Sequence, residues 1–136
     1  MRLRSLELRR IALDLVTPFR TSFGVEEHRD ILLLRVTTDV GEGWGECVAM
    51  VEPAYSPEFV NGAELVIAEH FWPILVAGGE LDAADVAHRL HRYKGHPMAK
   101  AALEMALLDA ELRAGATNLH GHFGGERDRV PSGVSV

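Results

Sequence analysis

The sequence contains a single cysteine, Cys47, so no disulfide can form within the chain. Cys47 lies in a strand-like stretch with glycine and valine neighbours, where a small buried apolar side chain is a more common role than a nucleophile. No apolar run approaches the roughly 20 residues that a transmembrane helix needs. The first ten residues, MRLRSLELRR, lack the continuous apolar stretch of a secretory signal. These absences predict a cytoplasmic protein with no membrane partner.

Positive charge is also scarce. The chain has 14 Lys and Arg against 20 Asp and Glu, which gives a formal net charge of -6 at pH 7. A nucleic acid or an anionic membrane requires a cationic surface, so we expect neither as a partner. The hydrophobic share of 47% is usual for a soluble globular protein, and 136 residues is the length of one domain.

Alternating apolar residues predict three strands in the first half of the chain. Residues 3–15 alternate with one change of parity at Arg9 and Arg10, which predicts two strand segments joined by a bulge. Residues 31–38 are rich in branched side chains, and residues 44–51 follow a glycine-rich turn. Because the connections are short, the three strands are expected to form an antiparallel meander.

Helix signals follow in the second half. A cap at Ser56 and a proline next to it predict a helix from residue 57 that ends before Pro73. A second helix is expected from Asp82 to Tyr93, and a third over residues 97–114. The predicted fold class is therefore α+β, with a three-stranded antiparallel meander followed by a helical bundle.

The helix predicted over residues 97–114 is apolar on more than one side. Alanines on its other faces would let a neighbouring backbone approach closely. We therefore expect it to pack on the sheet and also on something else. Its most regular apolar stripe consists of Met98, Ala101, Met105, Leu108 and Leu112.

Two histidine pairs raise the question of a metal site. His120 and His122 are separated by one residue, and His88 and His91 lie one helical turn apart, so each pair could place two imidazoles near one ion. No cysteine or carboxylate cluster completes either pair. A polar helix face or a loop is the more common explanation for both. The acidic residues likewise show no spacing that requires acid–base chemistry, and solvated loop charge explains them.

Two connections are unusually apolar for loops. The stretch PFRTSFGVEEHRD covers residues 18–30, and AMVEPAYSPE covers residues 49–58. In a meander both would leave the same end of the sheet and meet there. Spacing alone leaves two interpretations open: loops folded over their own core, or one wall of a small-molecule pocket. The side chains that raise the question are Phe19, Ser22, Phe23, Met50, Val51 and Tyr55.

Four stretches resemble the N-terminal part of the enolase superfamily: PFRTSFGVEEHRD, GWGECVAMVEPAYSPE, HPMAKAALEMALLDAELRAG and VPSGVSV. They are most similar to the branch with o-succinylbenzoate synthases and N-acylamino acid racemases, in the muconate-cycloisomerase-like subgroup. The resemblance implies an enolase N-terminal domain-like capping domain over residues 1–127. Residues 128–136 would begin the first strand of a (β/α)-barrel, whose remaining roughly 200–250 residues are absent from this sequence.

The resemblance implies an enzyme that abstracts the proton next to a carboxylate, in o-succinylbenzoate synthesis by dehydration or in N-acylamino acid racemisation. The barrel would hold a divalent metal, expected to be Mg2+, and would supply the catalytic lysines. Neither Lys94 nor Lys100 matches those positions, so we expect no catalytic residue, no metal ligand and no activity in this chain alone. The residues implied to bind a small carboxylate substrate are Phe19, Ser22, Phe23, Met50, Val51, Tyr55 and, in the first barrel strand, Ser135.

Other functions stay open. Muconate cycloisomerases and dipeptide epimerases share the capping domain of this resemblance. A non-catalytic binding or interaction module would use the same loops without chemistry. For the intact enzyme we expect a homo-oligomer, with helix 97–114 packed on the barrel or on another chain.

Overall fold

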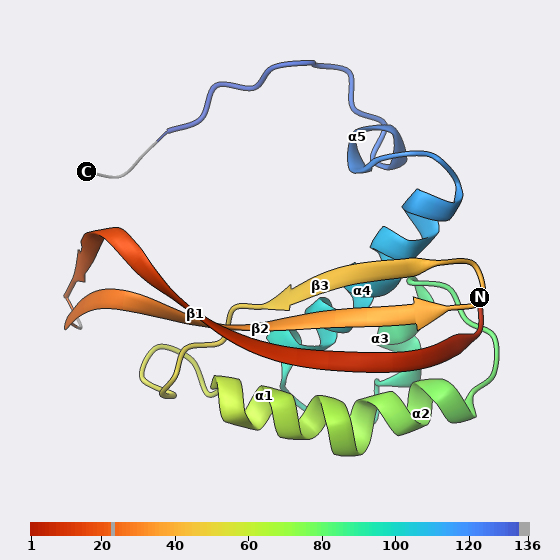
Figure 1. Ribbon diagram of the computed structural model, residues 1–136, viewed down its shortest axis with the longest axis horizontal. Coiled ribbons are helices and arrows are strands. Elements are labelled where there is room, and N and C mark those ends of the chain that lie inside the picture. The colour runs from red at the N-terminus through yellow and green to blue at the C-terminus, as the bar shows by residue number, and fades with distance from the viewer. Residues whose placement is uncertain (23, 134–136) are drawn as a thin grey trace.

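The computed structural model describes residues 1–22 and 24–133. Three strands form one antiparallel sheet in the order β1-β2-β3, and helices cover one of its faces (Figure 1). The predicted α+β fold is confirmed. The elements are β1 (Leu3–Thr21), β2 (Gly24–Thr38), β3 (Glu42–Cys47), α1 (Val60–Val66), the π-helical η1 (Ile67–Phe71), α2 (Trp72–Ala77), α3 (Asp85–Arg89), α4 (Pro97–Ala114) and α5 (Leu119–His122).

The hydrophobic core lies between the sheet and the helices. Alternate residues of β2 point into it, and Leu32, Leu34 and Val36 are completely buried. This alternation is the pattern of a strand with one covered face. From the helical side Phe71 and Leu103 complete the core. Within the described ranges, no helix is long and apolar enough to cross a membrane.

Helix α4 packs on the sheet, as predicted, and its alanine side makes the contact. Ala102, Ala106 and Ala110 are buried against β3, where Gly43 and Gly45 take inward positions. Of the more regular stripe, Ala101 and Met105 are exposed, whereas Leu112 is buried and Met98 and Leu108 pack against the core. Helix α4 is thus apolar on its covered side and on part of its outer side.

The stretch 18–30 is not a loop, contrary to prediction. It is the outer part of a β-hairpin, in which β1 and β2 pair as far as Thr21 and Gly24. We call residues 11–31 without residue 23 the hairpin arm; in Figure 1 it projects beyond the helices. The register is irregular between Leu3 and Ser5 and between Asp14 and Phe19. The second interval contains Pro18, which has no N–H to donate to a partner strand.

The predicted bulge at Arg9 and Arg10 is wrong. Both residues pair in unbroken register, with Leu33 and Leu32. Arg10 lies on the same inner face of the sheet as Leu32. Its guanidinium donates hydrogen bonds to Asp30 and Asn61 at the margin of the core. The apparent change of parity in the sequence arises because a charged residue takes an inward position.

The first long helix also departs from its predicted bounds. It begins at Val60 rather than at residue 57, and it continues through Pro73 to Ala77. The N–H of Trp72 donates to the carbonyl oxygen of Ile67, a π-helical step of five residues. A π-turn changes the local hydrogen-bond ladder, so a proline that would otherwise end an α-helix is accommodated.

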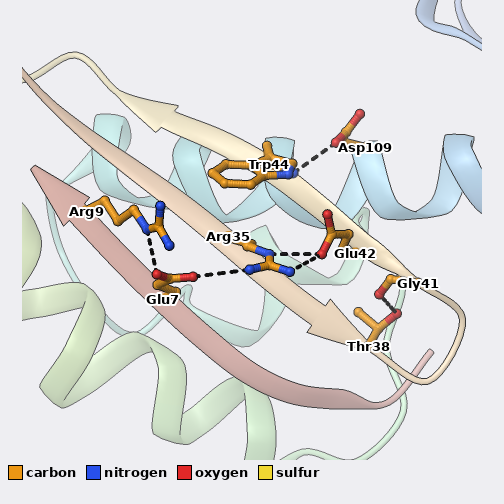
Figure 2. A network of polar contacts seen from close by, with 8 residues as sticks. All are labelled: Glu7, Arg9, Arg35, Thr38, Gly41, Glu42, Trp44 and Asp109. Carbon is orange, nitrogen blue, oxygen red and sulfur yellow. Dashed lines mark hydrogen bonds and ion pairs between the residues drawn. The ribbon is translucent and has the colours of Figure 1, made fainter. Parts of the chain in front are cut away.

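The outer face of the sheet carries a row of charges. Figure 2 shows the guanidinium of Arg35 between Glu7 and Glu42. Its Nη2 lies 2.5 Å from Glu42 Oε2 and its Nη1 lies 3.5 Å from Glu7 Oε2. The backbone N–H of Trp44 donates to Asp109 Oδ2 at 2.9 Å, which joins β3 to α4. These contacts connect all three strands and the helix behind them.

The last described residues are exposed and irregular. Residues 128–133 form no strand, and residues 134–136, with Ser135, lie outside the described residues. The predicted barrel strand therefore has no counterpart in residues 128–133. The division into residues 1–127 and 128–136 stays a prediction.

Candidate functional site

Two adjoining cavities are lined by residues of the hairpin arm and of the segment 48–55 that follows β3. The larger, about 500 Å³, is the aromatic cavity; its lining includes Phe19, Arg29, Met50, Ala54 and Tyr55. The smaller, about 430 Å³, is the acidic cavity; its lining includes Glu26, Asp30, Glu46, Val51 and Glu52. Both volumes lie within the range of small-molecule sites.

The hairpin register positions the arm's contribution to the aromatic cavity. Phe19 stands directly opposite Glu26, so the two side chains share one face of the arm. Beyond the helices this face has no core to cover. Phe19 is accordingly half exposed, at 50%.

The segment 48–55 supplies the opposite side of both cavities. The third strand, predicted to continue to residue 51, ends at Cys47, and the residues after it line the cavities opposite the arm. The carbonyl oxygen of Met50 accepts a hydrogen bond from the N–H of Val60 at 2.8 Å, which fastens the segment to the start of α1. The side chain of Tyr55 is 73% exposed at the rim of the aromatic cavity.

The predicted site residues separate into three groups. Phe19, Met50 and Tyr55 come together on the aromatic cavity, and Met50 and Val51 line the acidic cavity. Ser22 is exposed in the turn of the hairpin and lines neither cavity. The predictions for Phe23 and Ser135 fall outside the described residues. Substrate binding by any of the seven stays a prediction.

Two charged residues that the sequence reasoning did not assign lie at the junction of the cavities. Glu26 and Arg29 line both cavities, and Glu26 Oε2 lies 3.2 Å from Arg29 Nη2. The Arg29 guanidinium carbon lies 5.9 Å from the centroid of the Phe19 ring, within cation–π range. A hairpin in which Thr21 pairs with Gly24 would have indicated this arrangement, because that register places Glu26 opposite Phe19.

The acidic cavity carries an excess of negative charge. Asp30 is paired with Arg10, and their hydrogen bond raises the pKa of the arginine above its usual value. Glu46 and Glu52 have no ion pair among the residues that the structure describes. An anion entering this cavity would therefore meet uncompensated carboxylates.

The histidine pairs do not assemble a metal site. The rings of His88 and His91 stack with centroids 5.6 Å apart, and His91 Nδ1 lies 2.6 Å from the carbonyl oxygen of His88. Within residues 1–22 and 24–133, no group of three or more His, Cys, Asp or Glu side chains could hold a metal ion. A divalent metal therefore does not fit the described residues.

The chain is similar to known proteins of one family. Residues 6–124 match the model of the mandelate racemase / muconate lactonizing enzyme N-terminal domain. An N-succinylamino acid racemase of Amycolatopsis is 53% identical over the whole chain, and an o-succinylbenzoate synthase of Enterococcus faecalis is 34% identical over the whole chain. The chain spans 37% of the length of each of these relatives.

A solved structure shares the fold. It is a member of the enolase superfamily from Enterococcus faecalis, 34% identical to this chain, with a TM-score of 0.90. The match covers 100% of this chain and 37% of that chain.

Proposed function

The chain belongs to the N-terminal domain family of mandelate racemases and muconate lactonizing enzymes, and we propose that it caps the substrate in an o-succinylbenzoate synthase or N-succinylamino acid racemase. Its predicted resemblance to the enolase superfamily is confirmed. The hairpin arm and the segment 48–55 would form one wall of the substrate pocket in the intact enzyme.

One observation carries this proposal. Phe19, Met50 and Tyr55 come from two segments far apart in the chain, and they converge on one cavity of small-molecule size. Exposed apolar side chains grouped in a concavity, with few polar groups among them, are typical of a ligand site. Loops folded over their own core would instead bury these side chains.

The chemistry proposed for the intact enzyme starts at the carbon next to a carboxylate. A divalent metal, expected to be Mg2+, would stabilise the charge that develops on that carboxylate when the proton leaves. Because the metal does not fit the described residues, we assign it to none of them. The role proposed for these residues is to hold the part of the substrate that lies away from the reacting carboxylate and to exclude water from it. The inactivity of this chain alone and its cytoplasmic location stay predictions.

The outer side of α4 supports a proposal about assembly. Ala101 and Met105 leave an apolar strip exposed on this helix. We propose that the strip packs on the barrel of the intact enzyme or on another chain, and that the intact enzyme is a homo-oligomer. Light scattering of the intact protein before and after Met105→Glu tests this, because a buried charge would weaken such a contact.

Enzyme assays of the intact protein test the proposed activity. We expect racemisation of N-succinylamino acids, or dehydration of the hydrated precursor to o-succinylbenzoate. Phe19→Ala should raise KM about tenfold, because removal of an aromatic contact costs on the order of 1.5 kcal/mol. Val16→Ala is the matched control, since Val16 lies on the same arm, is fully exposed and lines neither cavity.

The assays also separate the alternatives. Turnover of muconate or of a dipeptide in place of the succinylated substrates would favour the cycloisomerase or epimerase interpretation. Absence of turnover with every substrate, in a folded intact protein supplied with Mg2+, would contradict the enzymatic proposal and favour a binding module.

A further inference from the structure

We propose that Arg29 binds the terminal carboxylate of the substrate's succinyl group and that Glu26 competes with this carboxylate for the same guanidinium. The inference rests on the proposed function and adds the residue that would select succinylated substrates. Arg29 suits this role by its position, by the weakness of its present ion pair and by the difference in charge between the two cavities.

Arg29 occupies the junction of the site. It lines both cavities, and among the described residues it is the one arginine or lysine that does so. Its guanidinium lies beside the ring of Phe19, and the side chain is 43% exposed, so ligands in the cavity can reach it. A guanidinium presents paired N–H donors that match the two oxygens of a carboxylate.

The present partner of Arg29 is replaceable. Glu26 makes one contact with it, at 3.2 Å, and both side chains are partly exposed. An ion pair of this kind is weak, because water competes for both charges. The carboxylate of a bound substrate, held in place by the rest of its contacts, can displace Glu26 at little cost.

The difference in charge between the two cavities determines how a bound succinyl group is oriented. The aromatic cavity has Glu26 and Arg29 as its charged lining residues, which balance each other. The acidic cavity adds Glu46 and Glu52, which have no ion pair among the described residues and would repel an anion. The methylenes of a succinyl group would therefore lie along Met50 and the Phe19 ring, with the terminal carboxylate at Arg29.

A purely structural role for Arg29 predicts a different outcome. If the ion pair only holds the arm in place, removing either partner should weaken substrate binding in the same direction. Competition predicts opposite directions, since loss of Arg29 removes the binding group and loss of Glu26 frees it. The signs of the two effects therefore distinguish the roles.

The experiment compares N-succinyl and N-acetyl derivatives of one amino acid with the intact protein. Arg29→Gln should raise KM for the N-succinyl substrate about 10- to 100-fold, as expected for a lost charged hydrogen bond, with kcat within about threefold. KM for the N-acetyl substrate should not change. KM of Arg29→Lys for the N-succinyl substrate should lie between the wild-type and Arg29→Gln values, because lysine keeps the charge but not the paired donors. Glu26→Gln should lower KM for the N-succinyl substrate by up to about fivefold.

Arg20→Gln is the matched control. Arg20 is an exposed arginine of the same arm, opposite Val25, and lines neither cavity. It should leave both KM values unchanged. Calorimetric titration with the N-succinyl compound gives the same comparison for any variant whose turnover is too slow to measure.

Two results would overturn the inference while the proposed function stands. The first is that the ratio of KM for the N-succinyl substrate to KM for the N-acetyl substrate is the same in Arg29→Gln as in the wild-type protein. The other is an equal rise in KM for both substrates in Arg29→Gln and Glu26→Gln. Failure of the wild-type protein to turn over either derivative would instead overturn the proposed function, and the inference with it.

Discussion

Gly45 of β3 lies so close to α4 that a Cβ atom added to it would be 2.0 Å from the carbonyl oxygen of Ala102. Gly43 stands in the same relation to Ala106, at 2.1 Å. These glycines let the helix backbone rest directly on the strand, because neither has a side chain to hold it away. The contact also sets the position of the site, since the segment 48–55 continues directly from β3.

Gly45→Ala is expected to destabilise the fold strongly. The new methyl group would meet main-chain atoms of α4, which cannot turn away as a flexible side chain can. Overpacking of this kind costs about 1–3 kcal/mol or more. Urea unfolding followed by circular dichroism should show a clearly lower midpoint concentration of urea for Gly45→Ala than for the wild-type protein. Gly133→Ala is the control, because its added methyl would have no atom within 4 Å; equal midpoints for the two variants would contradict the packing argument.

A second structural prediction concerns Glu58. Its buried carboxylate accepts hydrogen bonds from the N–H groups of Met98 at 2.9 Å and Ala99 at 3.1 Å, at the start of α4. The N-cap residue of that helix makes no side-chain cap. Glu58→Ala would leave buried donors unpaired, so we expect a loss of about 2 kcal/mol in unfolding free energy.

The control for this prediction is Glu104→Ala, which removes an exposed carboxylate from the outer side of α4. It should change stability by less than about 0.5 kcal/mol. Glu58→Gln should fall between the two, because an amide keeps one acceptor oxygen but not the charge. A Glu58→Ala protein as stable as the Glu104→Ala protein would contradict the capping role.

How far the sequence predicts this fold depends on whether a residue has a covered face. Leu32, Leu34 and Val36 alternate because helices cover one side of β2, and residues 31–38 were correctly predicted as a strand. Residues 16–22 and 24–30 of the hairpin arm lie beyond the helices, so they are held by backbone pairing and show no apolar alternation to detect. The continuation of the helix through Pro73 was missed for a related reason, since a π-turn has no known composition signal.

The candidate site was predictable in its apolar part. Phe19 and Tyr55 stand out in a sequence because exposed aromatic side chains in connecting segments are uncommon. Glu26 and Arg29 do not stand out, because charged residues are ordinary there. Their significance comes from the hairpin register, which brings them to the junction of the two cavities and cannot be inferred without knowing where the turn lies.

The charges on the outer face of the sheet predict an acid response. The hydrogen bond from Arg35 lowers the pKa of Glu42 below its ordinary value of 4.5 (Figure 2). The folded state therefore favours the carboxylate, and its stabilising effect is present above pH 4.5 and lost as the pH falls through the lower, folded-state pKa. We expect Glu42→Gln to reduce the drop in the thermal unfolding midpoint between neutral pH and about pH 3.

The matched control for the acid response is Glu46→Gln. Glu46 lies on the same strand but has no ion pair among the described residues, so its variant should keep the wild-type drop. Added salt should narrow the difference between wild type and Glu42→Gln, because exposed charges are screened. Identical pH profiles for all three proteins would exclude a contribution from the Arg35–Glu42 pair.

Burial raises the pKa of the Cys47 thiol, and no part of the residue is exposed. Thiol reactions require the thiolate, so the native protein should resist iodoacetamide at pH 8 and react at Cys47 only in urea. Mass spectrometry of the labelled peptide measures this directly. Val48→Cys in a Cys47→Ser background is the comparison, because position 48 is 57% exposed and should be labelled without denaturant. Stoichiometric labelling of Cys47 in the native protein would contradict its predicted role as a small buried apolar side chain.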